Sequence, residues 1–268
     1  MNSVGGKPAD GFGDYRSVNS QGWDVLSLLD NPAPFDPAAA RERLDTSSWI
    51  PWDQIHSVLC VAGGGGEQAP LFAALGYEVT VVDLSTGQLE RDRQVARELG
   101  LSVECIQADM LDLSPLSGRQ FDLVYQPVSA CYVPDVRRLY REIAGATRPE
   151  GHYAVEHWSP IHLRVAEDAA WDGTAYRIDR PASTDEAVVW RSAETWSGEV
   201  ATCLHYCHTL DALVGGLCDA GFDIVGLREP DVGDPTAEPS TDAHVAAYFP
   251  PFIRILARRR VDLGLGVP

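Results

Sequence analysis

The chain has 268 residues, of which 45% are hydrophobic, so it is long enough to bury a sizeable core in one large domain. With a formal net charge of −18, the chain lacks the basic surface that nucleic acids and anionic membranes attract, so neither is expected as a partner. No apolar run reaches the length of a membrane span and no signal peptide is recognisable, so we expect a cytoplasmic protein with reduced cysteines.

The first fifty residues are expected to form an N-terminal helical lid, followed by a main domain over residues 51–268. The spacing of apolar residues predicts one helix over residues 15–29 and a short second helix over residues 38–44. A proline-rich connector separates the two predicted helices.

Strands and helices then alternate regularly. The predicted strands are 57–62, 78–83, 102–107, 121–126 and 152–158, and the helices between them are 67–75, 86–99 and 135–147. This alternation is typical of right-handed βαβ units, so it predicts an α/β fold with a parallel sheet.

The regular pattern ends after Pro160. Residues 161–200 are polar, rich in tryptophan and aperiodic, so we expect an insertion that packs over the functional site. A strand is predicted over 198–208 and a helix over 210–220, and the final strands, 222–227 and 252–258, are expected to pair like a hairpin.

The strongest motif is a glycine run after the first predicted strand. Gly63, Gly64, Gly65 and Gly66 stand between this strand and a helix. Without a Cβ, these residues allow a ligand to approach the backbone, and the helix that follows presents free N–H groups. Gly64-x-Gly66-x-x-Ala69 also fits the dinucleotide pattern, so the loop by itself does not identify the cofactor.

Two acids follow the next two strands. Asp83 ends the second strand, where a carboxylate is able to accept both hydroxyls of a ribose, in NAD or in S-adenosylmethionine alike. Asp109 and Met110 follow the third strand, where an acid would accept an adenine amino group while the methionine covers the ring. The alternative for Asp109 is a loop acid that caps a turn.

Segments 58–83, 121–124, 133–135 and 148–151 resemble class I S-adenosylmethionine-dependent methyltransferases, in a match that extends over about residues 23–259. The resemblance implies a Rossmann-like, mostly parallel sheet of seven strands with helices on both faces and the last strand antiparallel. It also implies S-adenosylmethionine as cofactor, S-adenosylhomocysteine as product and a small-molecule acceptor, in a monomer or homodimer without a metal.

The resemblance assigns roles to individual residues. The implied cofactor-binding residues are Ala62, Gly63, Gly64 and Gly66 at the methionine end, Asp83 at the ribose, Leu84, Asp109 and Met110 at the adenine, and Gln126 and Pro127 facing the sulfonium. One position departs from the family, which usually has an acid where this chain has Cys60. In the family, that acid helps to organise the amino-acid end of the cofactor. We expect the N-terminal segment to replace this contact through Tyr15, Asn19 or Trp23.

Three residues are candidates for catalysis: His157, His208 and Gln126. Histidine is the usual general base, and His157 ends the fifth strand at the edge where α/β sheets bind ligands. A packed strand-end histidine is the alternative for His157, and a histidine that satisfies local backbone groups is the alternative for His208. The methylated atom, which is O, N, S or C, is left open.

Two further features have competing interpretations. Cys203, His205 and Cys207 share a face of a predicted strand and His208 follows, but this spacing matches no zinc site, so a plain strand is favoured. Four tryptophans in or beside the insertion are expected either in the core or in an acceptor pocket: Trp158, Trp171, Trp190 and Trp196.

The functional prediction is methyl transfer to a small molecule, with a place in secondary metabolism. Two alternatives stay open at this point. One is an NAD(P)-dependent oxidoreductase that uses the same glycine loop, and the other is a relative that binds the cofactor without methylating.

Overall fold

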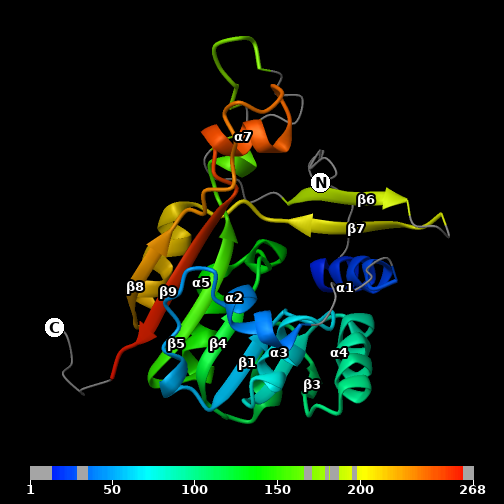
Figure 1. Ribbon diagram of the computed structural model, residues 1–268, viewed down its shortest axis with the longest axis vertical. Helices are drawn as coiled ribbons and strands as arrows, with labels where there is room; N and C mark the ends of the chain where they lie inside the picture. Colours follow the sequence, from blue (N-terminus) through cyan, green and yellow to red (C-terminus); the bar gives the residue numbers. More distant parts are fainter. Residues whose placement is uncertain are drawn as a thin grey trace.

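The computed structural model describes residues 14–28, 36–165, 171–178, 181, 187–194 and 198–261. Its centre is a seven-stranded sheet in the order β3-β2-β1-β4-β5-β9-β8 (Figure 1). The strands are β1 (Ser57–Val61), β2 (Glu78–Asp83), β3 (Glu104–Gln107), β4 (Phe121–Gln126), β5 (Thr147–Trp158), β8 (Phe222–Arg228) and β9 (Phe252–Arg259).

The first five strands run parallel, and β9 is antiparallel to both β5 and β8. This topology confirms the Rossmann-like fold with its last strand antiparallel. It also places the carboxyl ends of the parallel strands at one edge of the sheet, which is where folds of this class bind ligands.

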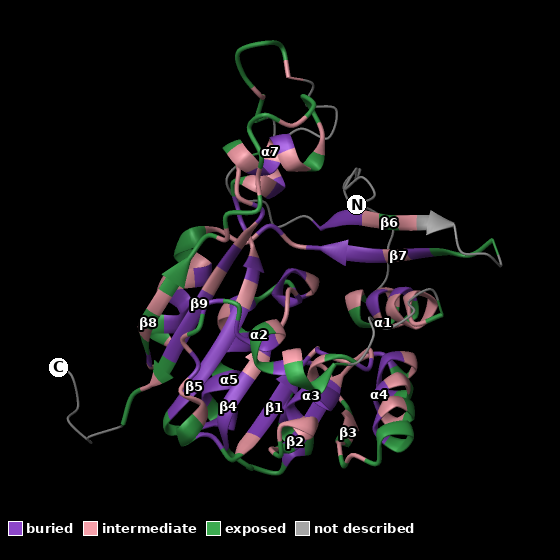
Figure 2. Ribbon diagram, in the orientation of Figure 1, coloured by how far each residue is buried: buried purple, intermediate pink, exposed green. Residues whose placement is uncertain are grey.

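Helices cover both faces of the sheet. Buried residues of α2, α3 and α4 join one apolar core, and buried residues of α5 and α6 join the other. Figure 2 shows the central strands as the most deeply buried part of the molecule. The helices are α2 (Ala40–Leu44), α3 (Gln68–Ala74), α4 (Thr86–Leu99), α5 (Val136–Ala146) and α6 (Gly216–Asp219).

Three elements lie beyond the carboxyl edge of the sheet. The helix α1 (Tyr15–Leu26) lies between this edge and a separate two-stranded sheet formed by β6 (Val188–Glu194) and β7 (Val200–His205) (Figure 1). Gly22 makes this packing possible, because a Cβ there would lie 2.3 Å from the carbonyl oxygen of Thr202 and 2.7 Å from Cys203 Sγ.

The structure differs from the sequence predictions in four places. The strand β6 lies in the stretch expected to be aperiodic, and the helix α7 (Asp242–Tyr248) lies between the two final predicted strands, where no helix is predicted. The predicted helix over 210–220 consists of a π-helical turn, Asp211–Gly215, and the short α6. The first fifty residues do not form one lid, since α1 lies over the carboxyl edge while α2 packs against a face of the sheet.

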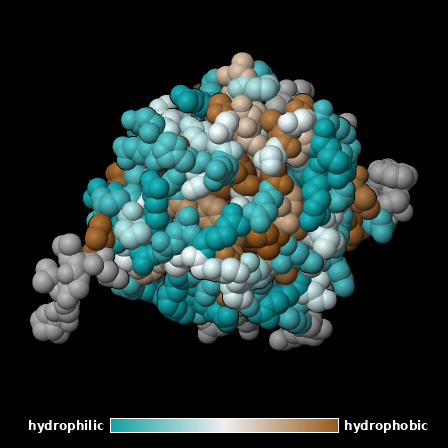
Figure 3. All heavy atoms as spheres, turned by 90° about the horizontal axis from the view of Figure 1, so that it is seen from below, coloured by the Kyte–Doolittle hydropathy of each residue, from teal (hydrophilic) through white to brown (hydrophobic). Residues whose placement is uncertain are grey.

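The surface agrees with the acidic composition. Seen from below, the molecule is mostly hydrophilic at its rim, with apolar side chains gathered toward the middle of this face (Figure 3). In the part of the chain that the structure describes, no helix is both long and apolar enough to cross a bilayer.

Candidate active site

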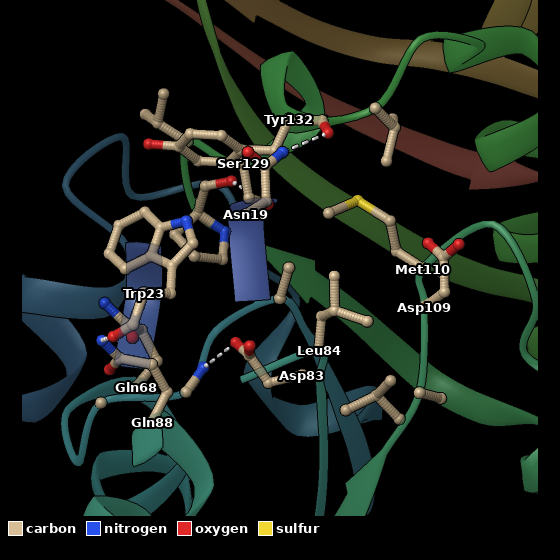
Figure 4. A pocket seen from close by; sticks show the side chains of 18 of the residues that line it. Asn19, Trp23, Gln68, Asp83, Leu84, Gln88, Asp109, Met110, Ser129 and Tyr132 are labelled. Atoms are coloured by element: carbon tan, nitrogen blue, oxygen red, sulfur yellow. Dashed lines mark hydrogen bonds between the residues drawn. The ribbon is translucent and has the colours of Figure 1, made fainter. Parts of the chain in front are cut away.

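A cavity of about 400 Å³ opens at the carboxyl edge of the sheet, beneath α1 (Figure 4). Its volume lies in the range typical of ligand pockets. It is lined by Tyr15, Asn19, Trp23, Ala62, Gly64, Gly65, Glu67, Gln68, Val82, Asp83, Leu84, Gln88, Ala108, Asp109, Met110, Pro127, Val128, Ser129, Tyr132, Val133 and Glu156. The cavity therefore collects residues from the ends of β1 to β5 and from α1.

The glycine loop forms one wall of this cavity. A side chain at Gly64 has no room, because a Cβ there would lie 2.8 Å from Gln88 Cβ and 3.0 Å from Asp83 Oδ2. Gly65 and Gly66 have φ angles of 120° and 82°, which side-chain-bearing residues rarely adopt. The predicted need for glycine at these positions thus has a structural basis.

Asp83 ends β2 directly beneath the glycine loop. Its carboxylate accepts hydrogen bonds from the backbone N–H groups of Gly64 at 3.0 Å and Ser85 at 2.9 Å. Burial raises the pKa of Asp83 to about 6, and the backbone hydrogen bonds oppose that rise. The aspartate is therefore held in a fixed orientation at the cavity wall.

Asp109 is engaged by α1. Its Oδ2 accepts hydrogen bonds from Tyr15 Oη and Arg16 Nε, both at 2.6 Å, and its Oδ1 accepts one from the N–H of Leu111 at 3.0 Å. Burial and the hydrogen bond to Asp109 raise the pKa of the Tyr15 phenol well above its usual value. The first turn of α1 is thereby fastened to the loop after β3.

The other end of α1 is fastened to the start of α4. Asp24 Oδ1 accepts hydrogen bonds from Ser85 Oγ at 2.5 Å and from the N–H of Gly87 at 2.9 Å. Gln88 Nε2 donates to the carbonyl oxygen of Trp23 at 3.1 Å. Because both of its ends are held, α1 forms a roof over the cavity.

The charge of the cavity is one-sided. Four carboxylates line it, those of Glu67, Asp83, Asp109 and Glu156, and the lining contains no lysine or arginine among the residues that the structure places. Arginines outside the lining pair with three of these acids and offset part of their charge: Arg16 with Asp109, Arg43 with Glu67 and Arg254 with Glu156. The cavity therefore favours ligands with positive charge over ligands with negative charge.

Most of the residues implied by the family resemblance come together here. Nine line the cavity: Tyr15, Trp23, Ala62, Gly64, Asp83, Leu84, Asp109, Met110 and Pro127. Gly63 and Gly66 belong to the loop but are not part of the lining. Gln126 lies behind the wall, where its amide accepts a hydrogen bond from Tyr153 and donates to Ser129 Oγ at 2.9 Å.

The two predicted catalytic histidines are not part of the lining. His157 is buried, its Nε2 lies 3.0 Å from the Tyr140 hydroxyl, and burial lowers its pKa to about 3. His208 Nε2 lies 3.1 Å from the carbonyl oxygen of Ala130, and burial lowers its pKa. Their surroundings favour the neutral imidazole in both cases.

Two acids at the site escaped the sequence analysis. Glu156 lines the cavity from the residue directly before His157. Asp92 on α4 is fully buried and accepts hydrogen bonds from the N–H groups of Gly65 and Gly66 at 3.2 Å and 3.0 Å. A signal for Asp92 existed, since an acid stands there between Leu89 and Ala96 on the apolar face of a predicted helix.

The tryptophans beside the insertion go to separate places. Trp158 stacks on His162, Trp171 packs against Tyr176 and α7, and Trp190 stacks on His205. None of the three lines the cavity. Trp196 is outside the described residues.

The Cys203 to His208 stretch does not gather into a metal site. His205 is buried with neither ring nitrogen hydrogen-bonded, and His208 bonds to Ala130 instead. Among the residues whose placement is described, no group of three or more His, Cys, Asp or Glu side chains is arranged to hold an ion.

Comparisons with known proteins agree with the fold. A family model described as a methyltransferase domain matches residues 59–155. An uncharacterised methyltransferase of Bacillus subtilis, YbaJ, is 29% identical over 186 residues, which cover 69% of this chain and 72% of that protein.

Solved structures show the same similarity. An S-adenosylmethionine-dependent methyltransferase from Mesorhizobium loti superposes with a TM-score of 0.60 at 26% identity, over 84% of this chain and 100% of the other. The [4+2]-cyclase SpnF superposes with a TM-score of 0.57 at 18% identity, over 96% and 99% of the two chains, so the fold by itself does not fix the reaction. The fold, the methyltransferase domain model and the methyltransferase relatives together support a class I S-adenosylmethionine-dependent methyltransferase.

Proposed function

We propose that this enzyme binds S-adenosylmethionine in the cavity beneath α1 and transfers the methyl group to a small-molecule acceptor. The observation that carries the proposal is the lining of four carboxylates without a cationic side chain among the described residues. S-adenosylmethionine carries a sulfonium cation, which such a lining attracts, whereas the pyrophosphate of a nicotinamide dinucleotide would be repelled. The charge of the cavity therefore argues against the oxidoreductase alternative.

The residues present fit this cofactor. When bound, S-adenosylmethionine supplies an electrophilic methyl group on sulfur. Asp83 and Leu84 lie between two ends of the cavity, with Asp109 and Met110 at one end and Trp23 and Gln68 at the other (Figure 4).

We assign the end with Asp109 and Met110 to the adenine and Asp83 to the ribose. The end formed by Ala62, Gly64 and Gln68 then takes the amino-acid part. In this assignment Gly64 provides the close backbone approach, because no Cβ fits at that position.

The acceptor is proposed to lie beside Glu156. Methyl transfer is an in-line displacement, so most of the catalytic effect comes from holding the acceptor in line with the sulfonium. Glu156 is the titratable side chain of β5 that faces the cavity, and its ion pair with Arg254 fixes its position. Such a carboxylate would orient an acceptor hydroxyl or amine and favour the positive charge that develops on it.

Several predictions remain as they stood. The catalytic roles of His157, His208 and Gln126 stay predictions, as do the methylated atom, the cytoplasmic location, a monomeric or homodimeric state and a place in secondary metabolism. The volume of about 400 Å³ supports an acceptor of small size, since the cofactor has to share the cavity with it.

Calorimetric titration tests the cofactor assignment. The purified protein is titrated with S-adenosylhomocysteine and, separately, with NADH and NADPH. We expect binding of S-adenosylhomocysteine only. Binding of a nicotinamide cofactor without binding of S-adenosylhomocysteine would overturn the proposal.

Labelled cofactor tests the reaction. The protein is incubated with methyl-labelled S-adenosylmethionine and a panel of small hydroxyl, amine, thiol and activated-carbon acceptors. Labelled product is expected from at least one class. Cofactor binding without labelled product from any class would favour the non-methylating alternative.

A further inference from the structure

The helix α4 carries a set of side chains that hold the glycine loop from below. Gln88, Asp92 and Val95 follow one another at intervals of four and three residues, so they share one face of the helix. The loop lies against this face: a Cβ on Gly65 would lie 2.8 Å from Gln88 Oε1, and a Cβ on Gly66 would lie 2.9 Å from Val95 Cγ2.

Asp92 is the polar centre of this face. One oxygen accepts a hydrogen bond from the N–H of Gly66 at 3.0 Å. The other accepts one at 3.2 Å from the N–H of Gly65, which also donates to the carbonyl oxygen of Gln88 at 3.1 Å. Its exposed fraction is 0%, and it is not part of the cavity lining. A buried acid is costly unless hydrogen-bonded, and here both oxygens serve the loop.

Cys60 lies near this acid and beside the glycine loop. It is fully buried at the end of β1, and its Cβ lies 3.5 Å from the place where a Cβ on Gly63 would be. Burial raises the pKa of its thiol well above the usual value, and the neighbouring Asp92 adds to the rise. Burial also raises the pKa of Asp92, to about 8, so Asp92 serves Gly65 and Gly66 as a hydrogen-bond acceptor, beside Asp83, which accepts from Gly64.

The N-terminal residues expected to compensate for Cys60 have other partners. Tyr15 bonds to Asp109, and the amide of Asn19 bonds to Tyr132 and to Leu204 on β7. Trp23 lines the cavity, but its carbonyl group is taken by Gln88. None of these hydrogen bonds goes to the glycine loop, but all three residues line the cavity, so their expected contact with the cofactor stays a prediction.

We propose that Asp92 is the positioning residue of the glycine loop and takes from α4 the place that an acid at position 60 would take from the strand. By fixing Gly65 and Gly66, it presets the loop that receives the amino-acid end of the cofactor. A loop of glycines is entropically costly to order, so presetting it strengthens binding without any direct contact between Asp92 and the ligand. This inference rests on the proposed binding of S-adenosylmethionine.

Binding of two ligands that share a nucleoside separates this role from general stability. S-adenosylhomocysteine has the amino-acid part, and 5′-methylthioadenosine lacks it. We expect Asp92→Ala to raise the Kd of S-adenosylhomocysteine about tenfold, which corresponds to about 1.4 kcal/mol, and to leave the Kd of 5′-methylthioadenosine unchanged. For Asp92→Asn, which keeps one accepting oxygen, we expect a Kd of S-adenosylhomocysteine between those of wild type and Asp92→Ala.

Moving the acid provides a rescue test. The double variant Cys60→Asp with Asp92→Ala is expected to recover most of the lost affinity, because the new carboxylate lies beneath the same loop. Glu90→Gln is the matched control, since Glu90 is an exposed acid of α4 that pairs with Arg97 and does not touch the loop.

The possible outcomes are distinct. If wild type does not bind S-adenosylhomocysteine, the proposed function fails. If wild type binds it and the Asp92 variants bind equally well, or if they lose both ligands in parallel, the role of Asp92 is refuted. Should Asp92→Ala not fold, the same comparison with Asp92→Asn decides.

Discussion

Glu156 and His157 are consecutive residues of β5 whose side chains serve opposite faces of the sheet. Glu156 lines the cavity and pairs with Arg254, whereas His157 is 2% exposed and hydrogen-bonded to Tyr140. Successive side chains of a strand alternate between faces, so only one of the two is able to reach the cavity. We therefore expect the acid, and not the histidine, to face the acceptor.

Separate substitutions of Glu156 and His157 are expected to have different effects. Glu156→Gln should raise the acceptor KM about tenfold, because a charge-assisted contact is lost, with little change in the Kd of S-adenosylhomocysteine. His157→Gln should lower the melting temperature and leave both constants nearly unchanged, because its partner Tyr140 is internal. Steady-state kinetics with an acceptor from the labelling panel, calorimetry and thermal unfolding measure these effects. An acceptor KM that responds to His157→Gln and not to Glu156→Gln would contradict this assignment.

Asp83 is expected to make cofactor binding depend on pH. Its pKa in the free protein is raised to about 6, so acidification below pH 6 protonates the carboxylate and removes acceptor capacity for ribose hydroxyls. The affinity for S-adenosylhomocysteine should therefore fall below pH 6 in wild type. In Asp83→Asn it should be about tenfold weaker at pH 7.5 and should not fall further between pH 6.5 and pH 5.

Calorimetry at several pH values measures this dependence. Asp112→Asn, at an exposed acid that caps a turn, is the control. A variant at Asp83 that keeps the wild-type pH profile would rule out this role for the carboxylate.

Gly22 is expected to be intolerant of a methyl group. Gly22→Ala places a Cβ against Thr202 and Cys203, so α1 has to shift from β7 at a cost of about 1–3 kcal/mol in the free energy of unfolding. Gly145→Ala is the matched control, because a Cβ there meets nothing within 4 Å and alanine favours the helix α5 by about 0.5–1 kcal/mol. Urea unfolding of both variants gives the comparison, and equal stabilities would show that α1 does not need this close approach.

His205 is expected to lower stability in acid. The imidazole is buried against Trp190 and Tyr132, and burial lowers its pKa to about 4. The unfolded chain then takes up a proton near pH 6.5 while the folded chain does not, so stability falls as the pH drops from about 6.5 to 4. The slope per histidine is up to about 1.4 kcal/mol per pH unit.

A difference measurement isolates this histidine from other titrating groups. His205→Phe keeps a flat ring between its aromatic neighbours and should lose less stability than wild type between pH 7 and pH 5. His56→Gln, at an exposed histidine, should follow wild type. Parallel curves for wild type and His205→Phe would exclude the proton uptake.

The sequence predicted the parts of the site that follow strand ends. Asp83 and Asp109 were recognisable because each comes directly after a predicted strand, and carboxyl ends of parallel strands meet at one edge. Glu156 was missed because the sequence does not show which face of β5 borders the cavity, and this decides whether Glu156 or His157 reaches it. Asp92 was missed because its partners, Gly65 and Gly66, precede it by more than two turns of helix and a complete strand.

Tertiary pairing explains the other differences. The strand β6 follows no clear alternation and is stabilised by its partner β7. The helix α7 is short, but its start was readable, since Thr241 caps it by accepting a hydrogen bond from the N–H of His244. The sequence indicates the need for Gly64, because this residue belongs to the glycine run. The need for Gly22 in α1 depends on the strand against which this helix packs, which the sequence does not show.

Asn19 shows that α1 is not a peripheral arm. Its amide oxygen accepts from the N–H of Leu204 at 2.6 Å, and its amide nitrogen donates to the carbonyl oxygens of Leu204 and Tyr132 at 3.3 Å and 2.9 Å. The Asn19 side chain thus pairs with both backbone groups of Leu204, as a neighbouring strand would, although the two residues are 185 positions apart in the sequence. Deletion of the residues before position 50 would remove these partners and uncover β7 at Leu204, so we expect the sheet of β6 and β7 to lose its attachment to the rest of the fold.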